Sequence, residues 1–139
     1  MTDIKTDHGH ASVPAVLQYL RRAEACGIDT QSCLDQAGIG SAVLDNNRQR
    51  VPGAALERLL ACLIPRSSDS CFGLHTSAFI QPASYSVLGY IAMNCSTVGE
   101  ALSLIPVYEK IVGDMGVTVA RPQGDNMCVQ WNCNFTHPL

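Results

Sequence analysis

Apolar residues recur at helical spacing along the first part of the chain. In the first such stretch they follow the spacing i, i+3, i+4 and i+7 of an amphipathic helix, at Val13, Val16, Leu17 and Leu20. Ser12 is a favourable N-cap, and Pro14 is tolerated in the first turn because its missing N–H would have no partner there. Gly27 suits a left-handed C-cap. The pattern therefore predicts a helix between Ser12 and Gly27.

Two further helical stretches are predicted in the first half of the chain. The shorter one begins at Asp29 or Thr30 and stops at Gly38. The longer one is expected to open at Arg50-Val51-Pro52 and to close at Pro65, because proline cannot donate to the helical hydrogen-bond ladder. Its apolar residues again repeat at helical spacing, at Leu56, Leu59, Leu60 and Leu63.

Two more helices are expected before residue 113. Pro82 and Ser84 introduce the first of them, whose apolar residues are Val87, Leu88, Ile91 and Ala92. Thr97 and Glu100 form a capping box at the start of the second, in which each side chain accepts a free backbone N–H. Pro106 lies inside that helix and should kink its axis, at a cost of about 3 kcal/mol.

After Gly113 the period of the pattern changes to two, which is typical of strands. Val117 and Val119 alternate with small or polar residues, and a second alternating run places apolar side chains at Met127, Val129, Trp131 and Cys133. Residues 122–126 between the runs have strong turn chemistry. A hairpin with one apolar face needs other strands or covering helices to be stable. We predict an α+β fold, with a helical N-terminal two-thirds followed by a β-hairpin that is part of a small antiparallel sheet.

Composition and charge narrow the class of protein. The chain has 139 residues and a net charge of −3. This negative charge argues against a nucleic-acid-binding surface in this part of the protein. No apolar run approaches the roughly 20 residues needed to span a membrane. The first ten residues are polar, so we expect no secretory signal and a cytoplasmic location. Residues 1–11 are expected to form a flexible tail, and residues 12–139 a single domain.

The chain contains seven cysteines, an odd number with no CxxC pair. In a cytoplasmic protein we expect reduced thiols, most of them buried as small apolar side chains. Cys128, Cys133 and His137 could together hold a metal, but their spacing matches no common zinc pattern and a fourth ligand is missing. We therefore predict no metal site and no cofactor.

Several stretches, in order, resemble the arabinose-binding-like N-terminal domain of AraC-type bacterial transcription regulators. They are Ala25-Cys26-Gly27-Ile28-Asp29, Leu34-Asp35-Gln36-Ala37-Gly38-Ile39, Arg50-Val51-Pro52, Phe72-Gly73-Leu74-His75, Leu88-Gly89-Tyr90 and Ser96-Thr97-Val98-Gly99-Glu100-Ala101-Leu102. The resemblance implies a domain that senses a small molecule or mediates dimerisation. It also implies a C-terminal half with two helix-turn-helix units that binds promoter DNA. That half is not in this sequence, so we expect a truncated regulator that forms a homodimer and touches DNA only through the missing half.

Four polar residues are our candidates for contacting a small-molecule effector, because ligand pockets are mostly apolar with a few placed polar groups. They are Gln81, Tyr85, Tyr90 and Asn94. Tyr90 and Asn94 are spaced to share one face of a helix. Tyr90 could instead pack in the core with its hydroxyl satisfied locally. Each of these roles remains open from sequence alone.

Charged and nucleophilic residues offer two further hypotheses. Arg48 and Arg50 could bind an anionic effector, although ion pairs with Asp45 and Glu57 are the simpler expectation. Cys71 and His75 are four residues apart, but no orienting carboxylate is visible, and the motifs of common enzyme classes do not occur. We therefore predict a non-enzymatic ligand-sensing domain. A ligand-free dimerisation module and a small stand-alone enzyme are the alternatives.

Overall fold

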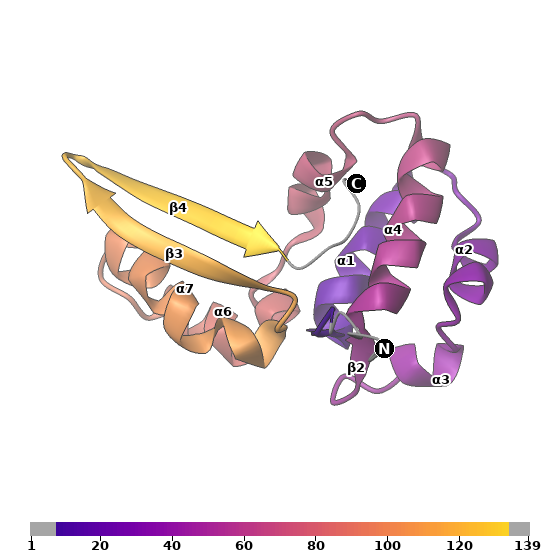
Figure 1. The fold of residues 1–139 in the computed structure, drawn as a ribbon, viewed down its shortest axis with the longest axis horizontal. Coiled ribbons are helices and arrows are strands. Elements are labelled where there is room, and N and C mark those ends of the chain that lie inside the picture. The colour runs from indigo at the N-terminus through magenta and orange to yellow at the C-terminus, as the bar shows by residue number, and fades with distance from the viewer. Residues whose placement is uncertain (1–7, 134–139) are drawn as a thin grey trace, which may run out of the picture.

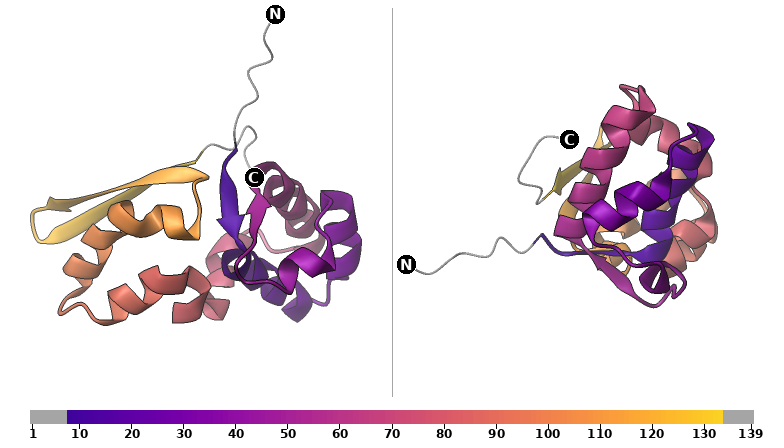
Figure 2. Two further views of the ribbon diagram at one scale, coloured as in Figure 1. Left: turned by 90° about the horizontal axis from the view of Figure 1, so that it is seen from below. Right: turned by 90° about the vertical axis from the view of Figure 1, so that its right-hand side faces the viewer.

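The chain folds into a helical lobe followed by a smaller lobe in which two helices support a β-hairpin (Figure 1). This computed structural model describes residues 8–133. The helical lobe covers residues 8–79 and the hairpin lobe residues 82–133, and the two lie side by side (Figures 1 and 2). The predicted α+β class, with helices first and a hairpin last, is confirmed.

Between residues 8 and 79 the structure describes two short strands, five α-helices and one 3₁₀ turn. In chain order they are β1 (His10–Ser12), α1 (Val13–Ala25), α2 (Thr30–Ala37), α3 (Ser41–Leu44), β2 (Arg50–Pro52), α4 (Gly53–Ser67), α5 (Phe72–His75) and the 3₁₀ turn η1 (Thr76–Phe79).

The sequence signals at the ends of the first two helices are confirmed. Ser12 occupies the N-cap position of α1, and Gly27 follows the helix with φ 75°. The carboxylate of Asp29 accepts the backbone N–H of Gln31 at 3.2 Å and caps α2. Gly38 ends α2 with φ 74°, a left-handed conformation that glycine adopts without steric cost.

Two expectations for the helical lobe are wrong. Arg50–Pro52 is a strand, β2, that pairs antiparallel with β1, and α4 begins only after it. The partner strand His10–Ser12 includes two residues assigned to the tail from sequence. Pro65 does not close α4, which continues to Ser67. In the last turn a proline removes only one ladder hydrogen bond, so the helix can end two residues later.

The core of the helical lobe lies between α1, α2 and α4. Its largest fully buried side chains are Phe72, Leu56, Leu59, Leu63, Val13, Val16 and Val51. Burial of aliphatic and aromatic side chains of this kind contributes about 1.5–3 kcal/mol each. The apolar stripe predicted for α1 therefore packs against the leucine stripe predicted for α4.

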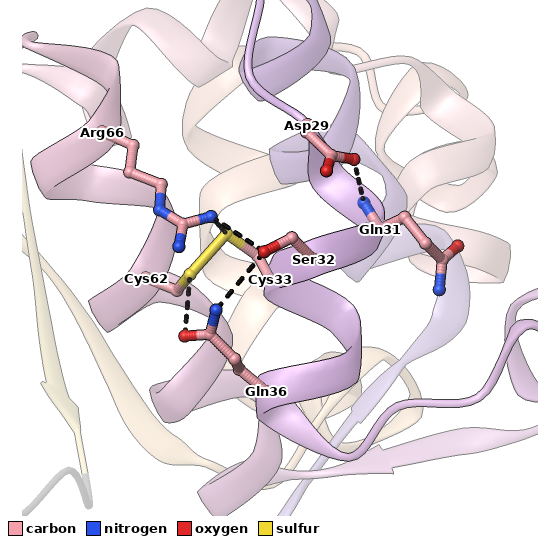
Figure 3. The surroundings of a disulfide bond; sticks show 7 residues. All are labelled: Asp29, Gln31, Ser32, Cys33, Gln36, Cys62 and Arg66. Atoms are coloured by element: carbon pink, nitrogen blue, oxygen red, sulfur yellow. Dashed lines mark hydrogen bonds between the residues drawn. A yellow bond between two sulfur atoms is a disulfide. The ribbon is translucent and has the colours of Figure 1, made fainter.

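A disulfide between Cys33 on α2 and Cys62 on α4 crosses this core (Figure 3). The two Cα atoms are 5.7 Å apart, which is an ordinary separation for a disulfide. The expectation that all seven thiols are reduced is therefore wrong. The expectation that most are buried is also wrong, because the five free cysteines are half-buried or exposed: Cys26, Cys71, Cys95, Cys128 and Cys133.

The hairpin lobe is built in three layers, with α7 between the hairpin and α6 (Figure 2). Its elements are the 3₁₀ turn η2 (Pro82–Tyr85), α6 (Ser86–Met93), α7 (Val98–Val112), β3 (Gly116–Gln123) and β4 (Asn126–Cys133). The capping box of α7 forms, with Thr97 Oγ1 accepting the N–H of Glu100 at 3.1 Å. The Glu100 carboxylate accepts the N–H of Ser96 at 2.8 Å, one residue before the expected partner.

The hairpin register separates the apolar residues that the sequence pattern placed on one face. The tight turn at Gly124 and Asp125 leaves Gln123 opposite Asn126, so that Val119 lies opposite Gln130 and Thr118 opposite Trp131. Directly opposite residues share a face of an antiparallel pair. Val117 and Val119 therefore lie on the face opposite to Trp131, and they are 54% and 37% exposed.

The two lobes meet where α1 packs against η2 and where β1 and β2 contact the end of α7. Ala11 on β1 forms a bridge with Gly113, and the N–H of Asp114 donates to the His10 carbonyl at 3.0 Å. Arg50 on β2 donates to the carbonyls of Lys110 and Ile111 at 2.8 and 2.9 Å, which closes the last turn of α7. Within residues 8–133 no helix is long and apolar enough to cross a membrane.

Candidate functional site

A cavity of about 310 Å³ lies where the two lobes meet. Its wall combines α1 from the helical lobe with η2, α6, α7 and the hairpin from the other lobe. Apolar side chains form much of the wall, among them Ala15, Leu88, Ile105 and Val112. Five polar or charged side chains interrupt it: Gln18, Tyr19, Tyr85, Glu109 and Thr118. This combination is typical of small-molecule sites, and the volume is at the lower end of their range.

Gln18 is the most unusual of the polar residues in the wall. It is only 5% exposed, and its Oε1 atom has no hydrogen-bond partner among the described residues. A buried acceptor without a partner costs about 1–3 kcal/mol. The position of Gln18 within the buried face of α1 prevents it from turning to solvent. Gln18 lines the cavity, so a bound donor group that reached its amide oxygen would recover this free energy.

Two tyrosines lie beside Gln18. Burial raises the pKa of Tyr19, and the nearby Tyr85 hydroxyl raises it further, whereas the Gln18 amide acts in the opposite direction. Burial also raises the pKa of Tyr85, again opposed by the Gln18 amide. Both phenols therefore stay protonated at neutral pH and offer a donor as well as an acceptor to the cavity.

Glu109 brings a carboxylate to the cavity from α7. Both of its oxygens accept the backbone N–H of Thr118 on β3, each at 3.0 Å. Glu109 is half-buried, and among residues 8–133 it is the only side chain lining the cavity that carries a formal charge at neutral pH. The bond to Thr118 thus fixes a negative charge in a mainly apolar wall.

Trp131 separates this cavity from a second one. The second cavity, of about 300 Å³, lies against the helical lobe and is lined by Leu56, Leu60 and Phe72. Tyr19, Met115 and Trp131 line both cavities. The indole folds closely over Gly116, where a Cβ atom would lie 2.8 Å from the ring. The absence of a side chain at Gly116 therefore allows Trp131 to reach the junction between the lobes.

The four predicted site residues do not lie together in the structure. Tyr85 lines the cavity, but Gln81, Tyr90 and Asn94 line neither of the two cavities. Tyr90 is 57% exposed, so it does not pack in the core either. The side-chain amide of Asn94 donates to the Tyr90 carbonyl at 2.8 Å at the end of α6. Gln81 is exposed at the start of η2.

Sequence reasoning missed most of the polar and aromatic residues of the cavity wall: Gln18, Tyr19, Glu109, Thr118 and Trp131. Gln18 had a recognisable signal, since it is the one amide within the apolar run of residues 13–20. Glu109 had none, because its neighbours along the chain say nothing about the strand that it meets. Trp131 was assigned to the apolar face of the hairpin, without an indication of what that face covers.

The Cys71–His75 pair has a carboxylate that was not foreseen from sequence. Asp69 Oδ2 lies 2.8 Å from His75 Nδ1 and accepts a hydrogen bond from Arg22 at 2.8 Å. His75 and Arg22 lower the pKa of Asp69 to about 2. Cys71 Sγ contacts the Ser70 hydroxyl at 3.9 Å, and residues 8–133 show no hydrogen bond between this thiol and His75. Asp69 therefore clamps α1 to the α5 segment rather than completing a nucleophilic site.

The expectation that Arg50 and Glu57 take part in the ion pairs proposed from sequence is wrong. Arg50 donates to backbone carbonyls of α7, as described above, and Glu57 pairs with His8 Nδ1 at 3.2 Å. The β1–β2 pairing decides this outcome, because it brings β2 beside the end of α7 and the segment before β1 beside α4. Among residues 8–133 no cluster of three potential metal ligands occurs.

The sequence matches a known family over most of its length. Residues 27–137 match the family described as the arabinose-binding domain of AraC transcription regulators, at the N-terminal end. The chain belongs to this family. The resemblance inferred from sequence is thereby confirmed, and membership of this family supports a ligand-sensing regulatory domain. No curated protein matches the chain. Tyr85, Glu109 and Trp131 fall within the matched range, whereas Gln18 precedes it.

Proposed function

We propose that this chain is the sensor domain of a bacterial AraC-type transcription regulator, and that its effector binds in the cavity between the lobes. The observation that carries the proposal is Gln18, which lines a cavity of about 310 Å³ and whose buried Oε1 has no hydrogen-bond partner within the described part of the chain. The full-length protein is cytoplasmic and binds promoter DNA through a C-terminal helix-turn-helix domain. The net charge of −3 in this chain supports the assignment of DNA binding to another domain.

Signalling follows from the position of the cavity. Gln18 and Tyr19 belong to one lobe, and Glu109 and Trp131 to the other, so a bound effector contacts both. The lobes are also joined by packing of α1 against η2, by the Ala11–Gly113 bridge and by several hydrogen bonds. An effector that binds one arrangement of the lobes more tightly shifts the population toward it. In a homodimer this shift changes the placement of the two DNA-binding domains.

A thermal-shift screen with a metabolite panel tests the proposal. Because the matching family is described as arabinose-binding, L-arabinose belongs in the panel beside amino acids, amines and acyl compounds. We expect one class to stabilise the domain saturably, by about 2.7 kcal/mol at a ligand concentration 100 times Kd. Gln18→Leu should abolish the shift, because it removes the acceptor and keeps the volume.

Gln31→Leu is the matched control, since Gln31 is exposed on α2 and lines neither cavity. A shift that is retained in Gln18→Leu, or that is lost in Gln31→Leu as well, would contradict the proposed site. A panel that produces no shift at all would contradict the proposed function.

Exposed apolar side chains on α7 favour a second candidate, a dimerisation module without an effector. Val107 and Ile111 are 65% and 40% exposed and lie one helical turn apart on the same face. Pairing of such faces across a two-fold axis would bury them. Sedimentation of wild type and Val107→Asp distinguishes the candidates. A tight dimer that is lost in Val107→Asp, combined with an empty ligand screen, favours the module.

A further inference from the structure

We propose that the effector is a small organic amine, held as its ammonium cation between the Glu109 carboxylate and Gln18 Oε1. This inference rests on the proposed function, because it assigns a ligand class to the same cavity. It goes beyond that proposal by predicting the sign of the ligand's charge and the donors that it must carry.

Glu109 differs from the other half-buried carboxylates in the partners of its charge. Three carboxylates among residues 8–133 are half-buried: Glu57, Asp69 and Glu109. Glu57 lies 3.2 Å from His8, and Asp69 contacts both Arg22 and His75 at 2.8 Å. Glu109 has no such partner in the described part of the chain, and no Lys, Arg or His side chain lines the cavity.

Glu109 is therefore the only carboxylate of this group whose charge is balanced by a backbone N–H alone. A half-buried charge in an apolar wall favours a partner of opposite sign, because a lower dielectric strengthens their attraction. An anionic ligand would be repelled by the same charge. The cavity thus selects for a cation over an anion of the same shape.

Gln18 and Glu109 both bring hydrogen-bond acceptors to the cavity. Gln18 Oε1 is a pure acceptor without a partner among residues 8–133, and the Glu109 oxygens can each accept a further bond. An ammonium group carries three N–H donors and no acceptor, so it matches two acceptors at once. An alcohol carries a single donor and leaves one of the two acceptors unmatched.

The aromatic and apolar parts of the cavity wall determine which skeleton the ligand can have. The rings of Trp131, Tyr19 and Tyr85 line the same cavity, and the faces of aromatic rings attract cations. Leu88, Ile105 and Val112 provide an apolar surface for a hydrocarbon skeleton. The volume of about 310 Å³ limits that skeleton to a small one.

Isothermal titration with matched probes tests the inference. The probes are hexylamine, 2-phenylethylamine and tryptamine, each compared with the alcohol and the carboxylate of the same skeleton. We expect at least one amine to bind about tenfold more tightly than its alcohol, because it gains a charge-assisted hydrogen bond. The matching carboxylate should bind more weakly than the alcohol.

A pair of charge variants assigns the effect to Glu109. Glu109→Gln keeps an acceptor for the Thr118 N–H and removes the charge, so amine affinity should fall by about tenfold while alcohol affinity stays unchanged. Glu24→Gln removes the same charge from an exposed site on α1 and should change neither affinity. The wild-type comparison of amine with alcohol stands even if Glu109→Gln folds poorly.

The outcomes separate the two proposals. If no amine binds, or if an alcohol, a carboxylate or L-arabinose binds more tightly than every amine, the amine inference is overturned. In that case a ligand whose binding still requires Gln18 leaves the proposed function intact. If none of these probes and no member of the metabolite panel binds, the proposed function fails as well.

Discussion

Glu109 on α7 accepts the backbone N–H of Thr118 on β3 with both carboxylate oxygens, each at 3.0 Å. This contact joins a helix to the edge of the hairpin that covers it. It also holds the carboxylate at the wall of the cavity between the lobes. One side chain therefore contributes both to the stability of the hairpin lobe and to the charge of the proposed effector site.

Truncation of Glu109 should weaken the hairpin lobe. We expect Glu109→Ala to lower the free energy of unfolding by about 1–3 kcal/mol, since a buried N–H loses its charged acceptor. Glu109→Gln should cost less than half of that because its amide oxygen can still accept the bond. Urea denaturation at neutral pH measures both values. Equal stability of Glu109→Ala and wild type would show that the contact is not needed.

A side chain at residue 116 should displace Trp131. In Gly116→Ala the new Cβ would lie 2.8 Å from the indole and 2.6 Å from the Asn132 carbonyl oxygen. We expect a loss of about 1–3 kcal/mol in the free energy of unfolding, together with a shift in tryptophan emission. Gly73→Ala is the control, because its Cβ would meet no atom within 4 Å. An unchanged emission spectrum in Gly116→Ala would contradict the close approach of the ring.

Reduction of the Cys33–Cys62 disulfide should destabilise the helical lobe. The bond closes a loop with a sequence separation of 29 between α2 and α4, and such a constraint contributes about 2–4 kcal/mol. Denaturation with and without a phosphine reductant measures the difference. The double variant Cys33→Ala/Cys62→Ala should be insensitive to the reductant, although the five free cysteines remain. Wild-type stability that does not change on reduction would contradict the assignment.

Asp69 should make stability fall in acid. Its pKa is about 2 in the folded protein, below the ordinary value of 3.8, because His75 and Arg22 favour the charged form. A depressed folded-state pKa stabilises the fold above the unfolded-state value, and that contribution is lost as the pH falls from about 4 toward 2. Asp69→Asn should be less stable than wild type at pH 6, and the difference should narrow toward pH 2. A constant difference across this range would exclude a role for its ionisation.

Local signals in the sequence predicted much of the fold. Gly27, Gly38 and the Thr97–Glu100 capping box lie at the ends of helices as expected. Each of these features depends on residues within a few positions of one another. The strand His10–Ser12 was not predicted, because it forms only by pairing with Arg50–Pro52, about 40 residues away.

The candidate site was less predictable for the same reason. Its wall combines Gln18, Tyr85, Glu109 and Trp131, which come from four segments that no local pattern connects. The hairpin register adds a second obstacle. A shift of one residue between the strands reverses which side chains face α7, and periodicity within each strand does not fix that shift. Tyr85 was proposed from sequence, and it lines the cavity beside residues that were not.

The most direct test of the central claim uses Trp131, the only tryptophan in the chain. Trp131 lines the cavity between the lobes, so an effector bound there must change its surroundings. We predict that a ligand that raises the melting temperature also changes tryptophan emission saturably, with the same Kd, and that Gln18→Leu removes both responses. A stabilising ligand that leaves the emission unchanged and still binds Gln18→Leu would place the effector elsewhere and contradict the account.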